Sequence, residues 1–178
     1  MRIDRTWMVY AAANILLFAL ADMINDGVAG WSVSVFLAGP CVVWPALRLG
    51  TFELMLCLAV GGLAADAALP TPPGFMMSLQ IAGAIFILAL RPWLGRIQRR
   101  HQLGLAWLLN AAFFAAFTIW ALARNHAGGA AFWERALVDF CLSQIIVLPI
   151  TLWFFDFQES ALALAGWTAA AAPAGEAS

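Results

Sequence analysis

The sequence is poor in charge. Only 11 % of its 178 residues are charged, the net charge is −1, and all nine basic residues are arginines, with no lysine among them. A chain with this balance has no overall electrostatic field that would attract a polyanion. We therefore expect no nucleic-acid partner.

The residues that carry metal and redox chemistry are also scarce. The three cysteines, Cys41, Cys57 and Cys141, stand singly in apolar runs without CxxC or metal-ligand spacing, so we interpret them as small hydrophobic residues. The sequence also lacks the G-x-S-x-G, H-E-x-x-H, Walker A and G-x-G-x-x-G motifs. We expect no metal, no cofactor and no enzymatic activity.

Apolar residues are abundant, at 64 % of the chain, and a soluble domain of this length cannot bury so many. The sequence therefore predicts an all-α integral membrane protein, a six-transmembrane-helix bundle within residues 1–157. The alanine-rich residues 158–178 are predicted to form a cytoplasmic, partly disordered tail. The six apolar segments are 7–24, 31–47, 51–69, 75–90, 104–123 and 132–155.

The first two segments have distinctive features. Ala19-Leu20-Ala21 fits the A-x-A grammar of a signal-peptide cleavage site, but Asn14 is atypical of such a segment, so we expect an uncleaved first helix. A polar stretch from Asp22 to Gly30 is predicted to be a turn-prone connection. In the second segment Pro40 and Pro45 each remove a backbone donor, which predicts a helix that is kinked or partly unwound where neighbouring helices cover it.

The third segment ends in Gly61-Gly62-Leu63-Ala64-Ala65-Asp66, and a turn containing Pro72 and Gly74 follows. An ionisable group in hydrocarbon costs about 2.5 to 3.5 kcal/mol at the centre of a helix, so Asp66 is expected to face protein or water. Gly62 lies one turn before Asp66 and would let another helix approach closely. The alternative is an interfacial Asp66 whose carboxylate reaches the lipid headgroups.

Other polar residues fall inside the apolar segments. Arg135, Asp139 and Ser143 follow one another at i,i+4 spacing and form a polar stripe on the sixth helix, in which Arg135 and Asp139 are predicted to pair. Asn14, Glu53, Asn110 and Asp139 either line a polar interior or act as hydrogen-bonding residues in helix packing.

The arginines predict the orientation. With the N-terminus inside, seven of them face the cytoplasm and only Arg124 and Arg135 face outward, so both termini are expected in the cytoplasm. The histidines His101 and His126 then lie on opposite sides of the membrane. A cytoplasmic basic loop after the fourth helix holds four of the inner arginines, Arg91, Arg96, Arg99 and Arg100.

These features together resemble the MreD family of rod-shape-determining membrane proteins. The family shows G-L-x-x-D followed a few residues later by L-G; Gly62-Leu63-Ala64-Ala65-Asp66 matches the first part, and Pro73-Gly74 stands where Leu-Gly is usual. The six-helix layout is also similar to the substrate-binding S-components of energy-coupling factor transporters.

The resemblance implies one of two functions. An MreD-like protein is a non-enzymatic scaffold of the bacterial cell-wall elongation (Rod) complex in the inner membrane, where it binds MreC and other Rod-complex membrane proteins. The resemblance to MreD also implies contacts with a partner protein or with another helix at the glycines, Asp66, the Pro72 turn and the Arg135–Asp139 stripe. An S-component instead binds a vitamin-sized ligand in an outward-facing pocket. The short external loops favour the scaffold.

Overall fold

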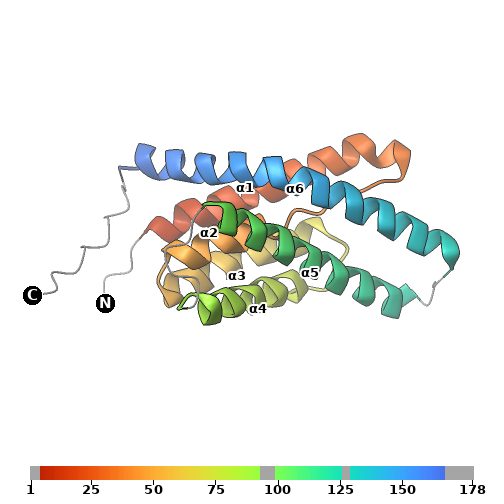
Figure 1. The fold of residues 1–178 in the computed structure, drawn as a ribbon, viewed down its shortest axis with the longest axis horizontal. Coiled ribbons are helices and arrows are strands. Elements are labelled where there is room, and N and C mark those ends of the chain that lie inside the picture. The colour runs from red at the N-terminus through yellow and green to blue at the C-terminus, as the bar shows by residue number, and fades with distance from the viewer. Residues whose placement is uncertain (1–4, 93–98, 126–128, 167–178) are drawn as a thin grey trace, which may run out of the picture.

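The computed structural model describes residues 5–92, 99–125 and 129–166. Every regular element in these ranges is a helix, which confirms the all-α class. The helices lie side by side in one bundle, and α1 begins at the end of the bundle where α6 ends (Figure 1). The elements are α1 (Thr6–Val28), the 3₁₀ turn η1 (Ala29–Trp31), α2 (Pro40–Arg48), α3 (Thr51–Ala68), α4 (Phe75–Leu90), α5 (Arg99–Asn125) and α6 (Ala130–Leu164).

Four of these helices, α1, α3, α5 and α6, are long and apolar enough to cross a membrane. The helix α4 is apolar but shorter, with 16 residues, and α2 has only nine. At about 1.5 Å per residue, α2 spans about 13 Å, less than half of the roughly 30 Å hydrocarbon core of a bilayer. The structure thus contains four helices that span a membrane by length and composition.

The second apolar segment differs most from its prediction. The helix expected over residues 31–47 is absent from the first half of that range, where residues 33–38 are extended, and it begins only at Pro40. Pro40 occupies the first turn of α2, where its missing N–H has no helical partner to lose. The residues before it include alternating valines, which favour extended backbone. The expectation of a partly unwound segment is therefore confirmed, whereas Pro45 is accommodated inside α2.

Three helix boundaries differ from their predicted positions. The stretch that begins at Asp22 was predicted as a turn, but α1 continues through it to Val28, so its first residues are helical. Arg99 and Arg100, predicted in a loop, lie in the first turn of α5. The last helix continues to Leu164, past the predicted boundary at residue 157, and the end of the predicted tail lies outside the described residues.

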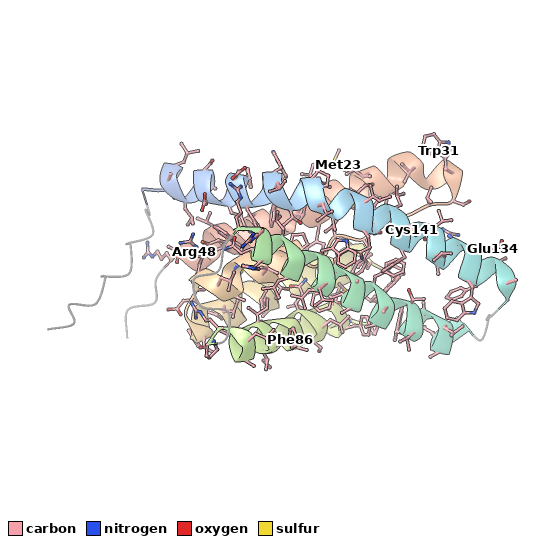
Figure 2. All side chains as sticks on the ribbon, viewed as in Figure 1. Met23, Trp31, Arg48, Phe86, Glu134 and Cys141 are labelled. Atoms are coloured by element: carbon pink, nitrogen blue, oxygen red, sulfur yellow. The ribbon has the colours of Figure 1, made fainter. Side chains whose placement is uncertain are left out.

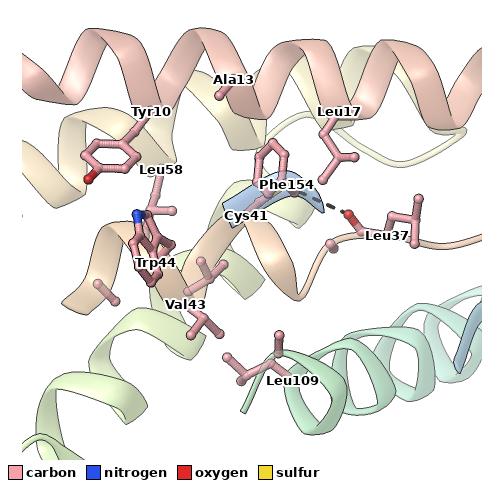
Figure 3. Close-up of a cluster of buried hydrophobic side chains, with 14 of the residues drawn as sticks. Tyr10, Ala13, Leu17, Leu37, Cys41, Val43, Trp44, Leu58, Leu109 and Phe154 are labelled. Atoms are coloured by element: carbon pink, nitrogen blue, oxygen red, sulfur yellow. Dashed lines mark hydrogen bonds between the residues drawn. The ribbon is translucent and has the colours of Figure 1, made fainter. Parts of the chain in front are cut away.

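The core surrounds α2. Cys41, Val43 and Trp44 are buried, and side chains from α1, α3, α5 and α6 pack around them (Figure 3). The Trp44 ring stacks on Phe155 of α6 with 4.9 Å between centroids. The shortest helix is therefore the central one, and it is shielded from lipid by the long helices.

The outside of the bundle is apolar. Met23 and Ile145 are each 70 % exposed, and Phe86 is 46 % exposed. Met23 and Phe86 lie on opposite outer faces of the bundle (Figure 2). Exposed apolar area on this scale agrees with a lipid-facing surface rather than a water-facing one.

Candidate functional site at the polar end of the bundle

Asp66, in the last turn of α3, accepts the hydrogen bonds that hold the turn between α3 and α4. Its Oδ1 accepts hydrogen bonds from the Thr71 hydroxyl at 3.0 Å and the Met76 N–H at 2.7 Å, and its Oδ2 accepts from the Gly74 N–H at 2.8 Å. The first N–H groups of a helix have no partner within the helix, and they carry partial positive charge. The Asp66 carboxylate therefore caps α4, and with 7 % exposure it is buried against protein.

The glycines before Asp66 bring other helices close. A Cβ atom on Gly62 would lie 2.4 Å from the Cα of Met77, so the α4 backbone passes directly over this residue. A Cβ on Gly61 would lie 3.3 Å from the Cβ of Asn14 in α1. Both glycines therefore contact other helices of the same chain.

Pro72 and Gly74 complete the same turn. The Pro72 carbonyl accepts a hydrogen bond from the Phe75 N–H at 3.1 Å. Gly74 has φ of +89°, in the left-handed region that glycine adopts without strain. In this conformation its N–H donates to Asp66 Oδ2, so the glycine and the carboxylate belong to one hydrogen-bonded turn.

Residues 33–39 form a second non-helical stretch, the extended stretch, in which residues 33–38 are extended and Gly39 bends into α2. Helices on several sides hold it. Asn25 of α1 makes a reciprocal pair with Val35: the Val35 N–H donates to Asn25 Oδ1 at 2.6 Å and Asn25 Nδ2 donates to the Val35 carbonyl at 3.1 Å. An extended backbone within a bundle has no helical hydrogen bonds of its own, so such side chains replace them.

Asn110 of α5 holds the end of this stretch. Its Oδ1 accepts from the N–H groups of Ala38 at 3.0 Å and Gly39 at 3.2 Å, and its Nδ2 donates to the Phe36 carbonyl at 3.0 Å. Asn110 is fully buried. A Cβ on Gly39 would lie 2.2 Å from the Ala106 carbonyl oxygen, so glycine is needed for this close approach of backbone to α5.

The predicted polar stripe on α6 holds the same stretch from the other side. Asp139 accepts from the Ser34 N–H at 2.8 Å and the Ser34 hydroxyl at 2.9 Å, and Ser143 Oγ accepts from the Phe36 N–H at 2.9 Å. The predicted pair is present with 3.9 Å between Arg135 Nε and Asp139 Oδ2, but the Arg135 side chain is 60 % exposed. The principal contacts of Asp139 are therefore its hydrogen bonds to the extended stretch, and its contact with Arg135 is secondary.

Asn14 makes a comparable contact deeper in the bundle. Its Nδ2 donates to the Cys41 carbonyl at 3.0 Å, and its Oδ1 accepts from Gln158 Nε2 at 3.5 Å. Of the two interpretations of the buried polar residues, Asn14 and Asn110 follow the packing one, because each bonds to backbone of a neighbouring segment. Asp139 also bonds to such backbone, and in addition it lines the pocket described below.

The predicted basic loop is only partly a loop. Arg91 follows α4 and donates to the Leu47 carbonyl at 2.7 Å. Arg99, in the first turn of α5, pairs with Asp156 of α6. Arg100 is exposed, and Arg96 lies outside the described residues. Arg48, which is 3.6 Å from Glu159, lies near the end of the bundle where α1 begins, and Glu134 lies at the other end (Figure 2).

A pocket of about 380 Å³ opens between the two non-helical stretches. Its apolar wall is made of Phe36, Phe114, Phe117 and Phe132. Its polar groups are Asp22, Asn25, Ser34, Thr118, Arg135 and Asp139. The volume lies within the range of about 300 to 1,000 Å³ for small-molecule sites.

Sequence reasoning missed this pocket and the role of Asn25 and Ser34. The polar residues were visible as exceptions in apolar segments, but their partners are backbone groups up to 107 residues away in the sequence. The four phenylalanines come from three separate segments. A pattern within one segment carries no sign that they converge.

Comparison of the chain with family models, curated proteins and solved structures gives no match.

Proposed function

We propose that the chain is a non-enzymatic membrane scaffold of the MreD type. It crosses the bacterial cytoplasmic membrane six times with both termini in the cytoplasm, binds an MreC-like partner and supports rod shape together with other Rod-complex membrane proteins. The observation that carries the proposal is the Asp66 cap. It gives the glycine and the carboxylate of the G-L-x-x-D motif, Gly62 and Asp66, a physical reason.

Three residues of the motif act together. Gly62 admits the α4 backbone, Asp66 caps the first turn of α4, and Gly74 supplies one of the donors from a left-handed conformation. Gly74 stands at the glycine of the family's Leu-Gly pair, so the position that requires glycine is kept. The departure at Pro73 falls on a residue that makes none of these contacts with Asp66.

A six-span topology agrees with the dimensions of the second segment. Six extended residues at about 3.3 Å each and nine helical residues at about 1.5 Å each reach about 33 Å, enough for a hydrocarbon core of about 30 Å. Extended backbone is tolerated at membrane depth only where protein covers it. The bonds from Asn25, Asn110, Asp139 and Ser143 meet that requirement.

The orientation is tested by thiol labelling of single cysteines in a background without the exposed Cys141. A thiol at exposed His101 is expected to react only from the cytoplasm, and one at exposed Glu134 only from outside. The reverse labelling would contradict the orientation, and labelling of both sites from one side would contradict the six-span topology.

The scaffold function is tested by co-purification with an MreC-like protein from mild detergent and by rescue of rod shape in a strain depleted of its own MreD. The wild-type chain is expected to do both, whereas Gly62→Leu, which forces α3 and α4 apart, is expected to do neither. Leu63→Ile conserves volume on an exposed position and serves as the matched control. Wild-type chain at normal level that neither rescues shape nor retains the partner would refute the proposal.

The pocket favours a second candidate, a substrate-binding S-component of an energy-coupling factor transporter. Aromatic and charged side chains converge there, as small-molecule sites require. The same co-purification distinguishes the two functions. Recovery of an ABC-type ATPase in place of an MreC-like protein would support the S-component.

A further inference from the structure

The pocket contains two charged groups that the fold uses little or not at all. Most of its polar side chains are committed: Asn25 pairs with Val35, the Thr118 hydroxyl donates to the Phe114 carbonyl, and Asp139 accepts twice from Ser34. Asp22, by contrast, is exposed and makes no hydrogen bond or ion pair within residues 5–92, 99–125 and 129–166. It is a carboxylate at a pocket wall with no internal partner.

Arg135 is the second group. Its only described contact is the 3.9 Å approach of Nε to Asp139, whose two oxygens already accept from Ser34. A guanidinium has five N–H donors in a fork, so the terminal nitrogens remain able to hold an anion. Asp22 and Arg135 come from different helices, α1 and α6, and they offer opposite charges to the same cavity.

We propose that this pocket binds a zwitterionic amphiphile, a molecule with an ammonium group, an anionic group and an apolar part. The ammonium pairs with Asp22, the carboxylate or phosphate pairs with Arg135, and the apolar part packs on Phe36, Phe114 and Phe117. A ligand with only one charge would leave one of these groups unpaired. An apolar amino acid and the headgroup region of phosphatidylethanolamine share this chemistry.

The test uses the full chain in nanodiscs of phosphatidylglycerol, which carries no ammonium group. The protein is titrated with L-phenylalanine and, separately, with short-chain phosphatidylethanolamine. Phenethylamine and 3-phenylpropionate, each with one charge, are the comparators for the amino acid, and short-chain phosphatidylglycerol is the comparator for the lipid. At least one zwitterion is expected to bind saturably, at least about tenfold more tightly than its comparators.

Two variants locate the site. Asp22→Asn is expected to weaken binding about fivefold, as for an ion pair at an exposed rim, and Arg135→Gln about tenfold. Asp26→Asn, an exposed acid on the same helix that is not part of the pocket wall, is the matched control and should bind like wild type. Because Asp22 makes no internal bond, its variant should unfold at the wild-type temperature.

Each outcome of these measurements either supports the proposal or overturns it. Binding of L-phenylalanine alone identifies a soluble amino-acid type of ligand, and binding of the phospholipid alone identifies a lipid. No saturable binding of either zwitterion, equal binding of the comparators, or wild-type affinity in Asp22→Asn overturns the proposal. These results are independent of MreC co-purification, so the scaffold function and the pocket can fail separately.

Discussion

The chain leaves the helical conformation at two places beside the same pocket, and the two are stabilised in opposite ways. In the turn between α3 and α4, Asp66 bonds to residues that follow it by 5 to 11 positions. In the extended stretch at residues 33–39, the partners on α5 and α6 are 71 to 107 positions away. The first stretch is a local structure that two neighbouring helices complete. The second has one local contact, between Asn25 and Val35, and its other partners are present only when α5 and α6 have packed against it.

The largest effect is expected at Asn110, which supports the non-local stretch. Asn110→Leu leaves two backbone N–H groups and one carbonyl buried without partners. Buried unsatisfied groups cost about 1 to 3 kcal/mol each, so the free energy of unfolding should fall by about 3 kcal/mol or more. Thermal unfolding in detergent, followed by tryptophan fluorescence, measures the loss.

Thr118→Val on the same helix is the control, because the Thr118 hydroxyl bonds only within α5. It should change stability by less than about 1 kcal/mol. An Asn110→Leu protein as stable as this control would show that the extended stretch does not depend on α5.

The two glycines come next, one in each region. Gly39→Ala and Gly62→Ala both place a methyl group against backbone, at 2.2 Å from the Ala106 oxygen and 2.4 Å from the Met77 Cα. Because backbone cannot rotate away, each should cost about 1 to 3 kcal/mol. Gly27→Ala, with nothing within 4 Å, is the matched control and should not destabilise. If Gly62→Ala were harmless, α3 and α4 would be free to move apart.

Asp66→Ala should have a smaller and more local effect. It removes the cap of α4 and the acceptor of the Thr71 hydroxyl, at a cost of about 1 to 2 kcal/mol. Hydrogen exchange is expected to rise at Gly74 and Met76 and to stay unchanged at Val35 and Phe36. Equal increases in both stretches would refute the distinction between a local and a non-local structure.

The smallest effect concerns Arg135 and Asp139. Since they are 3.9 Å apart and the Arg135 side chain is 60 % exposed, a double-mutant cycle of Arg135→Gln and Asp139→Asn should give a coupling energy of about 0.5 kcal/mol. The cycle of Ser34→Ala and Asp139→Asn should give more, because Ser34→Ala removes a hydroxyl that donates to Asp139 at 2.9 Å, closer than the 3.9 Å contact with Arg135. The reverse order would make the ion pair the principal contact of Asp139.

The same contrast explains how far the sequence could be interpreted. The Asp66 turn was accessible because its carboxylate, glycines and prolines lie within one short stretch, and local turn chemistry follows from such a pattern. The all-α class and the unwinding before Pro40 followed from composition and from proline. The extent of that unwinding did not, because it depends on Asn110, Asp139 and Ser143, and nothing in the sequence pairs a side chain with a distant backbone group.

The pocket was inaccessible for a further reason. Its phenylalanines have the same apolar character as the lipid-facing residues beside them, so hydropathy cannot separate the two classes. Asp22 was assigned to a connecting turn because it begins the polar stretch that runs to Gly30. The continuation of α1 to Val28 places Asp22 on a helix and beside the cavity.

The extended stretch at residues 33–39 also bears on how the protein is made. Asp139 leaves the ribosome 105 residues after Ser34, which at about 5 to 20 residues per second is a delay of roughly 5 to 20 seconds. Throughout that time several backbone N–H groups of the stretch have no partner, and hydrocarbon cannot supply one. In the proposed six-span arrangement, the N-terminal half is therefore expected to lack these hydrogen bonds until α6 has been made. A chain cut before residue 139 should stay a substrate for membrane quality control.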